Sequence, residues 1–237
     1  GKTYKFDVKY YDDESTPARG AQLAERLIQQ DGVDYMLGPY SSGMTKAIAP
    51  VSEKFGVPMV EAEGASRSLF TQGYKYLFAV LSTTDLYLPT AIDMAAASVS
   101  DPSKLKAVVA FEGDPFTADI RIGVLEKLDS YGIKVLVDDQ LPADLSDMST
   151  TLTKVKALKP DLLIISGHSK GAATAARQID EMKVNVPIIA LTHCEAAKVQ
   201  EKFPKTATGF LCPTQWIESI NKRDDYFGSA ADWNRGF

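Results

Sequence analysis

The chain has 237 residues, of which 45% are hydrophobic and 24% are charged, and its formal net charge is -5. This composition is typical of a folded globular protein with one large domain or two modest ones. The negative charge, with lysine and arginine scattered along the sequence, argues against nucleic acid as a partner. No apolar run approaches the roughly 18 residues that a membrane-spanning helix requires.

The first half of the chain alternates between strand-like and helix-like segments. Segments that are apolar, or that alternate apolar with polar residues, are expected to form strands at 2–11, 35–37, 58–61 and 76–80. A helix is expected after the start signal Thr16-Pro17, because apolar residues then recur at helical spacing: Ala21, Ala24, Leu27 and Ile28. A second helix is expected over 42–55.

The same alternation restarts after Asp85. Helices are expected from there to about residue 98 and then at 117–131, 148–158 and 171–182. Apolar runs between them predict strands at 107–111, 134–137, 161–165, 187–191 and 209–211. This order indicates an α/β fold with parallel sheets flanked by helices.

Each half is expected to form its own sheet, and therefore its own lobe. Ser82-Thr83-Thr84-Asp85 and Pro213-Thr214-Gln215-Trp216 are the candidate crossings, near 82–85 and 212–216. The first lobe would comprise 1–83 with 216–237, and the second 84–215. Because an open sheet without its outer strands leaves exposed edges, we expect the chain to be incomplete at both ends.

Small and hydroxylated residues follow two strands of the first half. Ligands of open α/β sheets bind beyond the carboxyl ends of strands, where helix N-termini present free N–H groups. Candidate ligand-binding residues at this edge are Tyr40, Ser41, Ser42, Gly64, Ala65 and Ser66. Ser42 can cap the helix and contact a ligand at the same time.

The second half places further candidates at the corresponding edge. They are Phe116 at the mouth of a helix, His168 and Ser169 after strand 161–165, and Thr192 and His193 after strand 187–191. No third metal ligand accompanies the two histidines at a useful spacing, so the sequence does not indicate a zinc site. Neither G-x-G-x-x-G nor a P-loop occurs, and no cofactor is expected.

Cys194 and Cys212 are too few for a disulfide framework and lack metal-type spacing. Two buried free thiols are the simpler interpretation. A single disulfide between them would suit an oxidising compartment, and the sequence leaves this alternative open.

Several short segments recur in a recognisable order. They are LGPYSS at 37–42, PVSEKFGVP at 50–58, GAS at 64–66, GYKYLF at 73–78, DPF at 114–116 and KPD at 159–161. No single segment is specific, but their order and spacing over essentially the whole chain resemble the leucine/isoleucine/valine-binding group of type I periplasmic solute-binding proteins.

The resemblance implies two Rossmann-like lobes that are joined by a three-segment hinge and close on a small ligand. It also implies a monomeric binding protein, not an enzyme, that is periplasmic or lipid-anchored outside the cell and delivers its ligand to the membrane permease of an ABC importer. Ser42 and the backbone of 64–66 would hold the ligand carboxylate. Residues from the second lobe would complete the site: Phe116, His168 or Ser169, and Thr192 or His193.

One departure from the family concerns the ligand's amine. Amino-acid binders of this family place an acidic residue near the position of Thr192 and His193, where it pairs with the ligand ammonium group. Here that position holds Thr192 and His193, and Glu195, although close in sequence, is expected to lie already in the following helix. An aromatic or aliphatic acid lacking an amine is therefore one candidate ligand. A branched-chain or aromatic amino acid is the other, because Glu61 or Glu63 could meet its ammonium group from the first lobe.

A rival interpretation comes from Gly167-His168-Ser169-Lys170-Gly171, which matches the G-x-S-x-G motif at a strand-to-helix turn. Taken alone, it predicts an α/β-hydrolase-type serine esterase that uses Ser169. His193 follows only one βα unit later, and no His-Gly-Gly oxyanion loop lies upstream, so a binding protein is the better interpretation. A ligand-sensing receptor or regulator domain would share the fold but differ by an attached DNA-binding or transmembrane segment.

Overall fold

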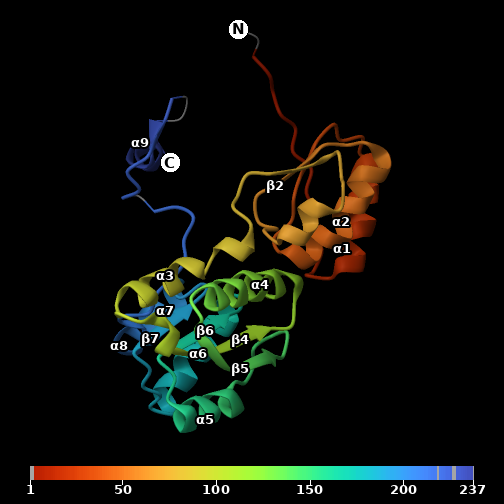
Figure 1. The fold of residues 1–237 in the computed structure, drawn as a ribbon. Coiled ribbons are helices and arrows are strands. Elements are labelled where there is room, and N and C mark those ends of the chain that lie inside the picture. The colour runs from red at the N-terminus through yellow and green to blue at the C-terminus, as the bar shows by residue number, and fades with distance from the viewer. Residues whose placement is uncertain (1–2, 218, 226–227, 237) are drawn as a thin grey trace.

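A computed structural model describes residues 3–217, 219–225 and 228–236 (Figure 1). Its elements form two parallel sheets, each with its own flanking helices, and a short C-terminal hairpin. The expected α/β class with parallel sheets is confirmed. Among the described residues, no helix combines the length and apolar character that crossing a membrane requires.

The first sheet has the order β1-β2-β3, with β1 at Met36–Leu37, β2 at Met59–Glu61 and β3 at Leu77–Ala79. Helices α1 (Pro17–Gln29) and α2 (Ser42–Phe55) pack together beside it. Side chains from α1, β1, α2 and β2 form its core: Ala24, Met36, Ile48 and Met59. Helix α2 begins and ends where the sequence predicts, because Ser41 caps it and Gly56 ends it at φ 67°.

The second sheet has the order β5-β4-β6-β7. Its strands are β4 (Lys106–Glu112), β5 (Lys134–Leu141), β6 (Leu162–Ser166) and β7 (Ile188–Leu191). Every residue of β6 is buried, because helices cover both faces of the sheet. Leu163 and Ile165 pack into the core beneath α5 (Ser149–Leu158) and α6 (Ser169–Glu181), and the alternate side chains pack beneath α3 (Pro89–Ala97) and α4 (Pro115–Ser130).

Shorter elements connect these units. The 3-10 helices η1 (Arg67–Thr71), η2 (Thr84–Leu86) and η3 (Pro102–Lys104) lie in loops, and α7 (Ala197–Lys202) and α8 (Pro204–Ala207) follow β7. The C-terminal hairpin of β8 (Arg223–Asp224) and β9 (Gly228–Ser229) leads into α9 (Ala230–Gly236) and stands apart from the first sheet (Figure 1). The assignment of 216–237 to the first lobe stays a prediction.

Two expected strands differ from the structure. Residues 3–11 form no regular element, and Lys2 lies outside the described residues. The alternating side chains of this segment are exposed, because no described strand pairs with it: Tyr4, Phe6, Val8 and Tyr10. The strand expected at 209–211 is reduced to one parallel bridge between Leu211 and Ala190, since Gly209 lies at φ 92° and Pro213 follows closely.

Cys194 and Cys212 are joined by a disulfide, so the interpretation as free thiols is wrong. The bond connects the loop after β7 to the segment that returns from the second sheet. Spacing could not reveal this, because the two cysteines meet only when Leu211 bridges to Ala190 at the edge of β7.

The two segments expected to cross between the sheets are bonded to each other. The side-chain carbonyl of Gln215 accepts a hydrogen bond from the backbone N–H of Ser82 at 2.7 Å, and its amide donates to the hydroxyl of Tyr87. The two segments therefore lie side by side, and their role as crossings stays a prediction.

Candidate ligand-binding cleft

A cleft of about 750 Å³ lies where loops from the carboxyl ends of both sheets face each other. The two segments expected to cross between the sheets contribute Ser82, Cys212, Pro213, Thr214, Gln215 and Trp216 to its wall, and the adjacent residues Leu81, Leu86 and Tyr87 extend it. Six of the residues predicted from the sequence line the cleft: Tyr40, Ser41, Phe116, His168, Thr192 and His193. The fold thus brings together residues from both halves of the chain.

The other five predicted residues lie outside the described lining: Ser42, Gly64, Ala65, Ser66 and Ser169. The residue that caps α2 is Ser41 and not Ser42: Ser41, at φ 85°, accepts a hydrogen bond from the N–H of Met44 at 3.3 Å. Ser42 is completely buried, and its hydroxyl accepts from the N–H of Ser66 at 3.0 Å. Ser42 and Ser66 therefore tie the loop after β2 to the first turn of α2, and direct ligand contact by either stays a prediction.

Glu61 is a structural carboxylate of the first sheet. It is fully buried at the end of β2 and accepts hydrogen bonds from Thr45 Oγ1 at 2.8 Å and from the N–H groups of Glu63 and Gly64 at 2.6 Å each. A Cβ at Gly38 would overlap this carboxylate. With its oxygens occupied in this way, Glu61 is unsuited to a ligand ammonium group, whereas Glu63 is exposed and lines the cleft.

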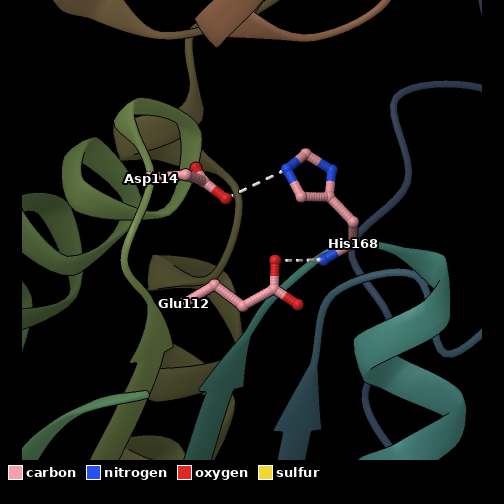
Figure 2. Close-up of side chains that lie close together, drawn as sticks. All are labelled: Glu112, Asp114 and His168. Carbon is pink, nitrogen blue, oxygen red and sulfur yellow. Dashed lines mark hydrogen bonds and ion pairs between the residues drawn. The ribbon is translucent and has the colours of Figure 1, made fainter. Parts of the chain in front are cut away.

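Across the cleft, the second sheet gathers a pair of carboxylates around a histidine (Figure 2). Glu112 ends β4, Asp114 caps α4, and His168 precedes the first residue of α6. The imidazole Nε2 of His168 donates to Oδ2 of Asp114 at 3.0 Å, and its backbone N–H donates to Oε2 of Glu112 at 3.2 Å. Oδ1 of Asp114 accepts from the N–H of Thr117 at 2.9 Å, so this aspartate also begins α4.

The electrostatics of these groups follow from burial and pairing. Glu112 is only 1% exposed, and this burial raises its pKa to about 7. Burial also raises the pKa of Asp114, but hydrogen bonds from His168 and Thr117 outweigh it and hold that pKa below its ordinary value. For His168, burial lowers the pKa, yet the bond to Asp114 and the charges of Asp114 and Glu112 outweigh it and raise the pKa.

Aromatic rings line the cleft as a connected group. The ring of Phe116 stacks on His168 at 4.9 Å between centroids and meets Tyr87 edge to face at 5.9 Å. His193 lies 5.8 Å from Phe116, and its Nδ1 donates to the carbonyl of Gly167 at 2.9 Å. Such a surface offers flat apolar contact area beside a small number of polar groups.

Thr192 joins the ends of two strands beneath these rings. Its hydroxyl donates to the carbonyl of Gly167 at 2.6 Å and is 2.8 Å from the N–H of the same residue. Only 1% of Thr192 is exposed, so it reaches the cleft as part of its floor.

Polar contacts also connect loops of the first sheet with helices of the second. The hydroxyl of Tyr40 lies 3.3 Å from Nδ1 of His168. The hydroxyl of Ser66 lies 3.0 Å from the carbonyl of Pro115 and hydrogen-bonds to the carboxylate of Asp119, which also accepts from the N–H of Ser68. The loops after β1 and β2 therefore contact the beginning of α4 and of α6 in this arrangement.

The G-x-S-x-G match has a packing explanation. A Cβ at Gly167 would lie 2.7 Å from Oε1 of Glu112, and a Cβ at Gly171 would overlap the same oxygen. Both glycines thus leave room for the buried carboxyl group. Ser169 is the first residue of α6, and no described hydrogen bond joins its hydroxyl to a histidine. The structure gives the esterase interpretation no support.

Glu112, Asp114 and His168 could also be considered as cation ligands, since each places one ligand atom within 4.8 Å of the others. In this structure Nε2 of His168 is bonded to Oδ2 of Asp114, and Oε2 of Glu112 accepts from the backbone N–H of His168. We therefore interpret the three as an ion-pair cluster.

Sequence reasoning missed this cluster, because Glu112 and Asp114 reach His168 only through the pairing of β4 with β6, where Phe111 lies opposite Ser166. It also missed Tyr87 and Trp216 in the lining, and the expectation that Glu195 lies in the following helix is wrong: α7 begins at Ala197, and Glu195 lines the cleft from the turn before it. The sequence did carry one signal for the cluster of Glu112, Asp114 and His168: a carboxylate at the end of a buried strand, followed by the cap sequence Asp-Pro.

The sequence matches the family of periplasmic binding proteins over residues 1–231. The chain belongs to this family. The expected resemblance to its leucine/isoleucine/valine-binding members is confirmed: the Leu/Ile/Val-binding protein BraC3 of Rhizobium johnstonii is 25% identical over 192 residues, which cover 78% of this chain and 49% of BraC3. The chain spans about half the length of the curated relatives that it matches.

Solved structures agree with this periplasmic binding protein fold. A leucine binding protein from Thermotoga maritima superposes with a TM-score of 0.77 at 21% identity, covering 90% of this chain and 59% of that protein. A solute-binding protein of an ABC transporter from R. palustris, in complex with benzoate, superposes with a TM-score of 0.76 at 17% identity, covering 95% and 66%. The first protein is named for leucine and the second is in complex with benzoate, so the two carboxylates differ.

Proposed function

We propose that this chain is the extracytoplasmic solute-binding component of an ABC importer. It binds one small carboxylate in the cleft, either a branched-chain or aromatic amino acid or a related aromatic or aliphatic acid, and the lobes 1–83 with 216–237 and 84–215 close around it. Its partners are this ligand and the membrane permease, and it acts as a monomer in the periplasm or as a lipid-anchored protein outside the cell. It is a binding protein and not an enzyme.

The observation that supports this proposal is the composition of the cleft wall. A volume of about 750 Å³ suits a small organic molecule, and both sheets direct loops from their carboxyl ends toward it. Aromatic rings are placed to contact an apolar ligand body, while Tyr40, Ser41 and His168 are placed to bind a polar head. Ligand contacts from both lobes would stabilise the closed arrangement over the open one.

A thermal-shift screen of the full chain tests the proposal. The panel contains isoleucine, phenylalanine, 4-methylpentanoate, 3-phenylpropanoate and benzoate, with benzamide and isoleucinamide as controls that lack the carboxylate. A ligand at 100 times its Kd adds about 2.7 kcal/mol to the free energy of unfolding, which raises Tm by several degrees. We expect such a shift for at least one carboxylate and not for the matching amide.

Two further measurements bear on closure and on the absence of catalysis. Small-angle scattering should show a smaller radius of gyration with the bound carboxylate than without it. A fluorophosphonate probe should leave Ser169 unlabelled. If no carboxylate shifts Tm, or if Ser169 is labelled, the proposal is wrong.

A further inference from the structure

The charges on the cleft wall are uneven. The lining includes the carboxylates Glu63 and Glu195, but its described residues include neither lysine nor arginine. Among the described lining residues, the histidines are therefore the side chains that can become cationic and pair with a carboxylate ligand. His168 and His193 are the candidates in the lining.

His168 is arranged to be that cation. Its Nε2 is committed to Asp114, and the stacked ring of Phe116 holds the imidazole plane, so Nδ1 is presented to the hydroxyl of Tyr40 across the cleft. His193 is arranged differently, because its Nδ1 donates to the carbonyl of Gly167 instead. Only His168, of the two, is held by a hydrogen bond to a carboxylate.

The groups around His168 divide into two sides. Glu112 and Asp114 approach from the end of β4 and the start of α4, and they favour a positive charge on the ring. His193 lies 6.0 Å away between centroids. On α6, the neighbouring Lys170 points to Asp144, 3.9 Å away, at the surface.

On the first-lobe side, Tyr40 is the group that faces Nδ1. Burial, together with the charge of Glu63 and of the second-lobe carboxylates, raises the pKa of Tyr40, so its hydroxyl keeps its proton. If His168 is an imidazolium, both Tyr40 and Nδ1 are donors, and a carboxylate placed between them satisfies both.

We propose that His168, as an imidazolium, is the cationic partner of the ligand's carboxylate, and that Nδ1 of His168 and the hydroxyl of Tyr40 bind this carboxylate together. The inference rests on the proposed function and specifies how that same cleft selects an anion. Asp114 is a positioning residue that orients the imidazole and keeps it charged. In the absence of a ligand, Tyr40 and His168 bind each other.

The pH dependence has a definite sign. The raised pKa of His168 means that the imidazolium persists to higher pH than for a free histidine. Affinity for a carboxylate should therefore be highest at low pH within the folded range and should decline as pH rises through that raised pKa. Burial raises the pKa of Glu112 to about 7, so this carboxyl group also ionises between pH 5.5 and 9, and its contribution must be separated.

Calorimetric titration of the full chain from pH 5.5 to 9 tests the proposal, with benzoate, 3-phenylpropanoate, 4-methylpentanoate and isoleucine as probes. His168→Gln should weaken binding of the carboxylate by about 10- to 100-fold at pH 6 and remove most of the pH dependence, since a hydrogen bond to a charged group is lost. Glu112→Gln should keep the decline with pH. Lys170→Gln, which removes a nearby surface charge outside the cleft, should leave affinity unchanged.

Asp114→Asn separates positioning from structure. Asparagine is also a good helix cap, so α4 should remain intact, while the midpoint of the affinity decline should move to lower pH. The chain has two histidines, so NMR can follow both imidazoles, and His193→Gln assigns them. We expect the apo His168 resonances to titrate above the ordinary histidine pKa of about 6.5, and Asp114→Asn to lower that midpoint.

The outcomes distinguish this inference from the proposed function. If a carboxylate binds wild type and His168→Gln equally well, the cationic role of His168 is refuted while the binding function stands. An apo imidazole that is neutral at pH 6 refutes it without any ligand. If none of the probes binds wild type, the proposed function fails and the inference fails with it.

Discussion

The carboxyl group of Glu112 occupies the space that a side chain at Gly171 would need. A Cβ at Gly171 would overlap Oε1 of Glu112 and lie 2.8 Å from Cβ of Leu145, which is itself fully buried. The glycine is therefore a packing requirement within α6. As a consequence, replacing this helical glycine with alanine should lower the free energy of unfolding, although the same replacement usually stabilises a helix.

Gly171→Ala should destabilise the protein by about 1 to 3 kcal/mol through overpacking, although alanine ordinarily favours a helix interior by about 1 kcal/mol. Urea unfolding measures the change. Gly43→Ala is the matched control in α2, because its Cβ would meet only Ser41 Oγ at 3.9 Å and should be neutral or mildly stabilising. Equal destabilisation by both substitutions would show that Glu112 is not the reason.

Glu112→Gln should change how stability depends on pH. Because the folded state raises the pKa of Glu112 to about 7, the folded protein holds this proton more tightly than the unfolded chain does. The free energy of unfolding should therefore fall as pH rises from the ordinary carboxyl pKa, 4.5, to about 7, by an amount on the order of 3 kcal/mol. The glutamine variant should lack this component when unfolding is followed from pH 4.5 to 8. Parallel curves for the two proteins would contradict the burial argument.

Removing the disulfide should lower stability. Cys194 and Cys212 are 18 residues apart, and a crosslink that closes a loop of this length contributes about 3 kcal/mol. The Cys194→Ser/Cys212→Ser double variant should unfold at correspondingly lower denaturant concentration, and reductant should affect wild type alone. Thiol titration of the unfolded, unreduced wild-type chain should detect no free cysteine; two free thiols would refute the bond.

Ser42→Ala leaves the N–H of Ser66 without its acceptor. We expect a loss of about 1 to 3 kcal/mol in the free energy of unfolding, the usual cost of an unsatisfied buried donor. Ser42→Ala and Ser66→Ala are also predicted to weaken carboxylate binding by about 1 to 3 kcal/mol, and calorimetry on both variants tests this. Ser98→Ala, which loses a hydrogen bond to Ala95 outside the cleft lining, should leave affinity unchanged. Unaltered affinity in both variants would show that Ser42 and Ser66 serve only to join the loop after β2 to α2.

The parts of the fold that depend on local signals were predictable from the sequence. Helix α2 is an example, since a serine cap and a glycine end define 42–55 without reference to the rest of the molecule. The segment 3–11 shows the limit, because alternation indicates a strand only where another strand is available to pair with it. The segment 209–211 failed for a different reason: the edge of β7 is available, but Gly209 and Pro213 limit the pairing to Leu211.

The site was predictable to the level of loops and not of side chains. Strand order in parallel α/β folds places Tyr40 at the carboxyl edge of the first sheet and Phe116, His168 and His193 at that of the second, and all four line the cleft. That Ser42 would turn inward to Ser66, and that Glu112 would lie beneath His168, depends on register and burial between distant segments. Such pairings have no signature in spacing along the chain.

Asp114 divides its two oxygens between unrelated duties, one at the start of α4 and one on the imidazole of His168. A substitution of Asp114 that removes its charge therefore also affects the cap of α4, and most replacements lose both the cap and the bond to His168. Asparagine is the exception, because it preserves the cap while withdrawing the counter-charge. If His168 pairs with the ligand's carboxylate as proposed, Asp114→Asn is thus the substitution that weakens acid binding at neutral pH while leaving the start of α4 intact.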